Sequence, residues 1–165
     1  MSPSTKNSSR LKSAKITSQS SDTRHMAMIG EKIIDLCLIA YVRRFRPLSF
    51  DSQSPYSVGL YSIDHRRLSY LEFPDEEQQQ LFLDNFRSDL HERGLLERFV
   101  DLTEGTLMLP SLIEWADHGP VDLGHVVRLH VADPNTPPVT GLFASKEASM
   151  EMLKTLARLL SPAAK

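Results

Sequence analysis

The stretch MAMIGEKIIDLCLIAYVRRFR, residues 26–46, is the most hydrophobic run of the chain, and it ends in a cluster of arginines. At about 100° per residue, its large apolar side chains fall on one broad arc, and most of the charged ones take the remaining sector. A helix that is apolar over more than half of its circumference is buried on two sides. We therefore expect residues 26–46 to form the central helix of a small core. The single cysteine, Cys37, lies on the apolar arc and is expected to be a shielded core residue.

The charge of the chain is divided unevenly along its 165 residues. Its formal net charge is −2, but four of the 19 basic residues lie in the first 21 positions, where there is no acidic residue. The other 15 basic residues therefore face all 21 acidic ones. A basic arm on an acidic body argues against a globular face that binds nucleic acid.

Residues 1–25 are rich in Ser and Thr and nearly lack large apolar side chains. Such a segment buries too little surface to offset its ordering entropy, so we expect a flexible arm in front of one domain over residues 26–165. Its cations would bind an acidic partner surface; they are Lys6, Arg10, Lys12 and Lys15. The same composition is also typical of an organellar transit peptide, and that alternative stays open.

Turn residues and apolar alternation predict the elements that follow. A hairpin is expected over residues 58–73, then a helix opened by the N-cap Asp75 and ended at Gly94. A second hairpin, over residues 97–109, would turn at Glu104-Gly105. Four further elements are expected: a short helix from Pro110 stopped by Gly119-Pro120, strands over 125–132 and 139–143, and a last helix from Ser145 to about Leu160.

This order predicts an α+β fold. We expect a single antiparallel sheet of about five to six short strands, with a long central helix and two further helices packed on it, because hairpin-length links join neighbouring antiparallel strands. The order of elements resembles that of roadblock-like and other profilin-like domains. The resemblance is at the level of the fold and implies no particular activity.

Motifs that carry chemistry are missing from the sequence. There is no G-x-S-x-G elbow and no glycine-rich phosphate loop. The only cluster of acids and histidines spans residues 117–133, and its histidines lack the spacing of a zinc site. We expect no cofactor and no metal, and we keep a small metal-dependent hydrolase that uses this cluster, with His118 and His125, as a third hypothesis.

Two groups of cations stand out in the body of the chain. Arg43, Arg44 and Arg46 end the hydrophobic stretch, and Arg66 and Arg67 lie in the predicted turn of the first hairpin. If the fold brings both groups to one end, they form a patch for an acidic partner, nucleic acid or a lipid head group. Otherwise they are a solvated surface.

Residues 91–98, HERGLLER, are followed by the second hairpin. This pattern resembles the recognition helix and wing of winged-helix proteins. The resemblance implies DNA binding through cations such as Arg87, Arg93 and Arg98. The acidic start of the helix, Asp75 to Glu77, would repel phosphate, and a strand rather than a helix-turn pattern precedes it.

The sequence thus favours a non-enzymatic interaction protein, a small adaptor or accessory subunit that acts through surface contacts. The expected partner is a protein with an acidic surface, and the winged-helix regulator is the alternative. No membrane span is expected, because the hydrophobic stretch carries Glu31, Lys32 and Asp35. A chain with one cysteine and no secretory signal is expected in the cytoplasm.

Overall fold

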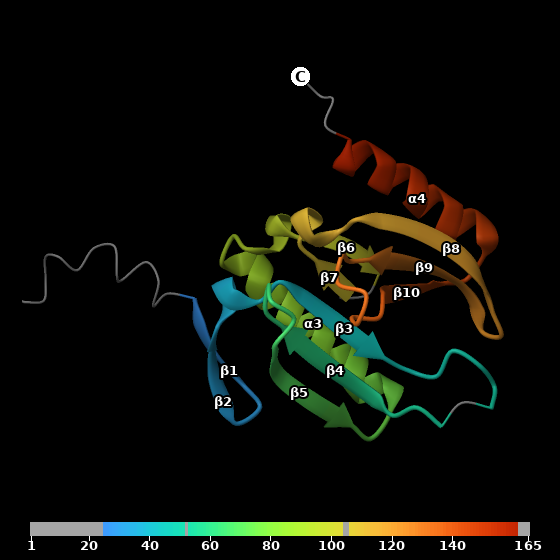
Figure 1. Ribbon diagram of the computed structural model, residues 1–165. Helices are drawn as coiled ribbons and strands as arrows, with labels where there is room; N and C mark the ends of the chain where they lie inside the picture. Colours follow the sequence, from blue (N-terminus) through green and yellow to red (C-terminus); the bar gives the residue numbers. More distant parts are fainter. Residues whose placement is uncertain (1–24, 52, 104–105, 162–165) are drawn as a thin grey trace, which may run out of the picture. The chain divides into compact units, whose positions relative to one another are not determined.

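The computed structural model describes residues 25–51, 53–103 and 106–161 (Figure 1). The chain divides into two compact units, one ending at Leu38 and the other starting at Ile39. The four cations of the predicted arm, Lys6, Arg10, Lys12 and Lys15, lie outside the described residues.

The first unit contains a small hairpin. Strand β1 (Met26–Ile29) pairs with β2 (Lys32–Asp35) in antiparallel register, and a 3₁₀ turn, η1 (Leu36–Leu38), follows. The prediction of a helix over residues 26–46 is therefore wrong. Gly30 adopts a φ of 63° between the two strands. This left-handed conformation is open to glycine at little steric cost, and it lets the chain reverse.

The position of Cys37 contradicts the expectation that it is a shielded core residue. Its side chain is exposed, and its backbone N–H donates to Oδ1 of Asp35 at 3.0 Å. The prediction of a shielded core thiol depended on the helical arc. Once residues 26–38 form strands and a 3₁₀ turn, the arc that placed Cys37 inside does not exist.

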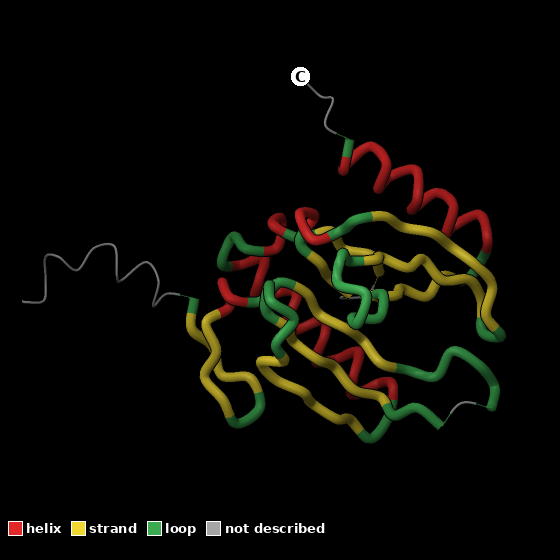
Figure 2. Tube along the Cα trace, in the orientation of Figure 1, coloured by secondary structure: helices red, strands yellow, loops and turns green. Residues whose placement is uncertain are grey.

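The second unit contains a sheet of five strands in the order β5-β4-β3-β7-β6 (Figures 1 and 2), with each neighbouring pair antiparallel. The last residues of the hydrophobic stretch form its middle strand, so they are strand and not helix. The bounds are β3 (Tyr41–Phe45), β4 (Tyr56–Tyr61), β5 (Arg67–Phe73), β6 (Val100–Thr103) and β7 (Thr106–Met108). Both predicted hairpins are confirmed, although the turn residues 104 and 105 lie outside the described residues.

Helix α3 (Glu76–Glu92) lies across one face of this sheet (Figure 1). Its buried residues Leu83, Phe86 and Leu90 recur at helical spacing and pack toward β4 and β5. Asp75 caps its start by accepting a hydrogen bond from the N–H of Gln78 at 2.9 Å. This helix and its cap are confirmed as the sequence predicted them.

A second sheet follows, with the order β10-β9-β8, and helix α4 lies over it (Figure 1). Its elements are β8 (Trp115–Val121), β9 (Gly124–His130), β10 (Val139–Phe143) and α4 (Lys146–Leu160). The strands predicted at 125–132 and 139–143 and the helix capped by Ser145 are confirmed.

The predicted short helix after Pro110 is only a 3₁₀ turn, η3 (Pro110–Leu112). Gly119 and Pro120 do not stop a helix but belong to β8, which is an edge strand. An edge strand tolerates proline, because the N–H that proline lacks can be one that has no partner strand.

The prediction of a single antiparallel sheet with three helices packed on it is also wrong. The described residues form three sheets, of two, five and three strands, and two α-helices, α3 and α4. The resemblance to roadblock-like and profilin-like order fails with it, because residues 26–46, which were expected to form the leading helix of that order, contain strands and a 3₁₀ turn. The main core of the second unit joins β3 and β7 to β9 and α4 through Tyr41, Met108, Leu129 and Leu156. Val139 of β10 belongs to the same core, and the packing of β10 against β3 and β7 brings the candidate site together.

Candidate anion-binding pocket

Strand β3 sends its arginines to opposite sides of the five-stranded sheet. Side chains alternate along a strand, so Tyr41, Arg43 and Phe45 share one face, and Arg44 takes the face on which α3 lies. The middle position of β3 in the sheet fixes this arrangement, because Arg43 pairs with Gly59 of β4 and Arg44 with Val58.

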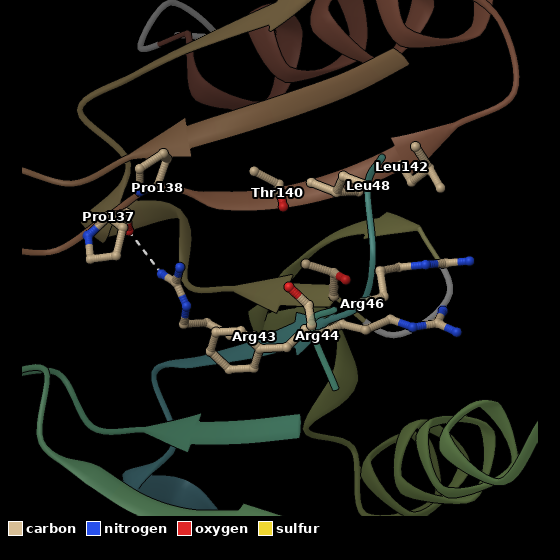
Figure 3. A pocket seen from close by; sticks show the side chains of 11 residues that line it. Arg43, Arg44, Arg46, Leu48, Pro137, Pro138, Thr140 and Leu142 are labelled. Atoms are coloured by element: carbon tan, nitrogen blue, oxygen red, sulfur yellow. Dashed lines mark hydrogen bonds between the residues drawn. The ribbon is translucent and has the colours of Figure 1, made fainter. Parts of the chain in front are cut away.

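A pocket of about 290 Å³ lies between β3 and β10 (Figure 3). Three sequence-predicted residues, Arg43, Arg44 and Arg46, line it together. The other lining residues come from the loop after β3, from β7, and from β10 with the loop before it; they are Phe45, Leu48, Ser54, Thr106, Pro137, Pro138, Thr140 and Leu142. No aspartate or glutamate is among the described residues that line this pocket.

The side chain of Arg44 is held rigidly between the five-stranded sheet and α3. Its side chain is 3% exposed, and its Nε donates to Oε1 of Gln79 at 2.8 Å. Gln79 is fully buried in α3, and its Nε2 donates to the carbonyl oxygens of Phe45 at 2.8 Å and Ser57 at 2.9 Å. A buried amide with all of these bonds fixes the guanidinium in place.

Arg44 and Arg46 share the carboxylate of Glu76 at the start of α3. Arg46 forms a close ion pair with Glu76, and Arg44 lies 3.7 Å from the same carboxylate. Glu76 is about half exposed, so this pairing leaves the acid at the surface and outside the pocket lining.

Arg43 differs from its two neighbours. Its Nη1 donates to the carbonyl oxygen of Pro137 at 2.8 Å, and its guanidinium carbon lies 5.4 Å from the centre of the Phe45 ring. Burial lowers the pKa of Arg43, and Tyr61 and Tyr41 act in the opposite direction. An arginine stays charged throughout the physiological range. Among the described residues no carboxylate forms an ion pair with Arg43.

The wall opposite β3 carries proline, threonine and leucine side chains (Figure 3). Thr140 and Leu142 alternate on β10 and therefore share a face, and Thr106 contributes a buried hydroxyl group from β7. Within the described part of the chain, neither Thr106 nor Thr140 uses its hydroxyl in a side-chain hydrogen bond. The pocket thus combines cations, hydroxyl groups and an apolar rim.

The second predicted group of cations is not part of this pocket. Arg66 and Arg67 are exposed at the β4–β5 turn, and the guanidinium carbon of Arg67 lies 4.8 Å from the centre of the Tyr70 ring. The structure therefore unites Arg43, Arg44 and Arg46 but places Arg66 and Arg67 elsewhere.

Within the His/Asp cluster of residues 117–133, Asp117 and His130 form ion pairs in the sheet of β8 and β9. Arg128 donates to both carboxylate oxygens of Asp117, at 2.8 and 3.1 Å, and His130 lies 3.3 Å from the same carboxylate. The His130 ring stacks on Trp115 with 3.7 Å between ring centres. Hydrogen bonding by Arg128 lowers the pKa of Asp117. The described residues contain no group of three potential ligands that could hold a metal ion.

Of the three cations of the winged-helix hypothesis, Arg87 and Arg93 form ion pairs and Arg98 contacts an aromatic ring. Arg87 pairs with Asp101 at 2.6 Å, and Arg93 pairs with Asp89 one helical turn earlier at 3.0 Å. Arg98 packs over the neighbouring Phe99 ring. Each of these contacts would compete with binding to a phosphate backbone.

Sequence reasoning missed Gln79, Thr106, Thr140, Pro137 and Pro138. Residues of β7 and β10 reach β3 only through tertiary packing, so no local pattern marks them. Gln79 lies in the run Gln78 to Gln80, and the sequence gives no sign of which of the three is buried.

In the described part of the chain, no helix is both long enough and apolar enough to cross a lipid bilayer. Comparison of this chain with protein-family models, with curated proteins and with solved structures gave no match.

Proposed function

We propose that this protein is a non-enzymatic interaction protein, a small adaptor or accessory subunit, and that it binds an acidic segment of a protein partner in the pocket over β3. The observation that carries the proposal is Arg43, a half-buried cation that lines a pocket and has no carboxylate partner among the described residues.

Arg43 is the group that a partner would satisfy. Within the described residues its guanidinium contacts a carbonyl oxygen and an aromatic ring, and neither carries a formal charge. A desolvated cation gains most from a charged acceptor, and a hydrogen bond to a charged group contributes about 1.5–3 kcal/mol. An acidic side chain of the partner would supply this acceptor.

The lining of the pocket supports binding rather than catalysis. Among the described lining residues, the charged side chains are all arginines, and the hydroxyl groups belong to Ser54, Thr106 and Thr140. An arginine holds its proton at physiological pH, and a hydroxyl acts as a base or nucleophile only beside an activating group. Such a pocket can orient an anion, but it offers no side chain suited to exchanging a proton with it.

The N-terminal arm carries charge of the same sign as the pocket. Its cations would therefore bind the same acidic partner, and they would not themselves occupy an arginine-lined pocket; they are Lys6, Arg10, Lys12 and Lys15. We place the complex in the cytoplasm, because the sequence has one cysteine and shows no need for disulfides.

The test is an affinity capture from the source cells with the full chain as bait, followed by quantitative mass spectrometry. The matched baits are Arg43→Gln in the pocket and Arg67→Gln on the exposed turn, which remove the same charge. Proteins that bind wild type and Arg67→Gln but not Arg43→Gln are expected, and their acidic segments, made as peptides, should bind the pure protein more weakly as salt rises. If no captured protein depends on Arg43, the proposal is wrong.

A bait that lacks residues 1–25 separates the arm from the pocket. We expect it to keep the Arg43-dependent partners with reduced affinity and a shallower salt dependence. Equal affinity and equal salt dependence would remove the arm from the proposal but leave the pocket in it.

A further inference from the structure

The donors of the pocket over β3 come from different walls. The guanidinium of Arg43 comes from β3, and the hydroxyl groups of Thr106 and Thr140 come from β7 and β10. A carboxylate is planar, and its two oxygens are satisfied by one edge of a guanidinium. A phosphate monoester presents three strong acceptor oxygens in a tetrahedral arrangement, which suits donors on several sides.

The positive charge of the pocket also favours a phosphate monoester over a carboxylate. Three arginines line it; Arg44 and Arg46 share the carboxylate of Glu76, so they leave one net positive charge in addition to that of Arg43. A phosphate monoester carries about −1.5 to −2 charges at pH 7, so it gains more from this field than a carboxylate does.

The size and surroundings of the pocket favour a phosphate that is attached to a chain. Its volume of about 290 Å³ is far above the ~10–15 Å³ of cavity volume that one water needs. It therefore has room for a phosphate together with the stem of a side chain, against Leu48, Pro138 and Leu142. A second hollow of about 330 Å³ shares Arg46, Leu48 and Ser54 with it and continues to Asp122, which gives a path for the flanking residues.

We infer that the pocket over β3 recognises a phosphate monoester on a phosphorylated side chain of the partner, in preference to a plain carboxylate. Arg43 would bind the phosphate oxygens as the central donor, and Thr140 would add a hydrogen bond from the opposite wall. This inference rests on the proposed function, and it names the chemical group that the partner inserts. Asp122 at the continuing hollow would disfavour an acidic residue on that side of the phosphorylated one.

The experiment is an isothermal titration of the full chain with four probes. These are inorganic phosphate, a short peptide with one phosphoserine, the same peptide with glutamate at that position, and the same peptide with unmodified serine. The variants are Arg43→Gln, Thr140→Val as a mild change on the other wall, and Arg67→Gln as the matched control. Circular dichroism and thermal unfolding establish that each variant is folded.

We expect the phosphoserine peptide to bind at least about tenfold more tightly than the glutamate peptide, and Arg43→Gln to weaken it on the order of tenfold or more, as the loss of a charged hydrogen bond predicts. Thr140→Val should weaken the phosphoserine peptide more than the glutamate peptide. Arg67→Gln should bind like wild type. This pattern would support the inference even if Arg43→Gln proved unstable, because Thr140→Val tests the same site.

Three results would overturn the inference. Equal binding of the glutamate and phosphoserine peptides, lost in Arg43→Gln, would leave an acidic partner but remove the preference for phosphate. Inorganic phosphate that binds as tightly as the phosphoserine peptide would assign the site to a small phosphate ligand instead of a partner chain. If no probe binds in an Arg43-dependent manner and affinity capture still yields Arg43-dependent partners, only the phosphate assignment fails; if both experiments fail, the proposed function fails as well.

Discussion

Arg44 of β3 and Gln79 of α3 meet between the helix and the five-stranded sheet, where Nε of the arginine donates to Oε1 of the glutamine at 2.8 Å. The same glutamine donates to the backbone carbonyls of Phe45 and Ser57. One buried amide therefore joins the helix to two neighbouring strands and also fixes one of the arginines that line the pocket.

Replacement of Gln79 should cost much of the stability of the fold. Gln79→Leu removes three hydrogen bonds and leaves two carbonyls and a guanidinium nitrogen without this partner in a buried site, so we expect a loss of about 2–3 kcal/mol in the free energy of unfolding. Urea denaturation followed by circular dichroism measures it. Gln78→Leu, one residue earlier and exposed, is the matched control and should change stability by less than about 0.5 kcal/mol. Equal effects of the two changes would contradict the buried role of Gln79.

The start of α3 should depend on the side-chain oxygen of Asp75. Asp75→Ala loses the hydrogen bond from the N–H of Gln78 and is expected to destabilise the protein by about 1 kcal/mol. Asp75→Asn keeps an equivalent acceptor and should cost clearly less. Thermal or urea unfolding of the pair decides the matter, and an alanine variant as stable as the asparagine one would exclude the cap as a source of stability.

The ion pair between Asp117 and Arg128 should make stability depend on acid pH. The pKa of Asp117 is lowered in the folded state, chiefly by hydrogen bonding from Arg128. Its contribution is therefore present above the ordinary aspartate pKa of about 3.9 and is lost as the pH falls through the lowered folded value. Since the Asp117 side chain is 38% exposed, solvent screening keeps the contribution below about 1 kcal/mol.

The comparison of wild type with Asp117→Asn isolates this contribution. Urea unfolding should show the wild type to be the more stable protein at pH 6, and the difference should shrink steadily as the pH is lowered below 4. A stability difference that stays constant down to pH 2 would mean that ionisation of Asp117 is not its source.

Cys37 should react in the native protein. Its side chain is exposed after β2, so a thiol reagent such as 5,5′-dithiobis(2-nitrobenzoic acid) is expected to modify one thiol per chain without denaturant. The rate should approach that measured in urea within about an order of magnitude, since accessibility governs how fast a free thiol reacts at a given pKa. A thiol that reacts only after unfolding would restore the buried cysteine that the sequence suggested.

Several elements of the fold could be predicted from the sequence because their signals are local. Asp75 and Ser145 mark helix starts through hydrogen bonds to N–H groups three residues later, and these bonds need no distant partner. The hairpin of β4 and β5 and the alternation of Val127 and Leu129 in β9 also depend on near neighbours. Residues 26–46 predict a helix from sequence and fold as strands because a dense apolar run satisfies both the helical and the strand period.

The sequence by itself determined two capped helices, the two hairpins and the two groups of arginines in the body of the chain. Only the tertiary structure decided that Arg43, Thr106 and Thr140 line one pocket and that Arg66 and Arg67 do not. Pairing of β3 with β7 brings in the first hydroxyl group, and the packing of β10 against β3 and β7 brings in the second. The physical reason is that helix caps, tight turns and side-chain periodicity depend on residues that are close in sequence. Whether an apolar segment becomes a strand or a helix depends on the partner that buries it, and the free energy of the whole fold determines that partner.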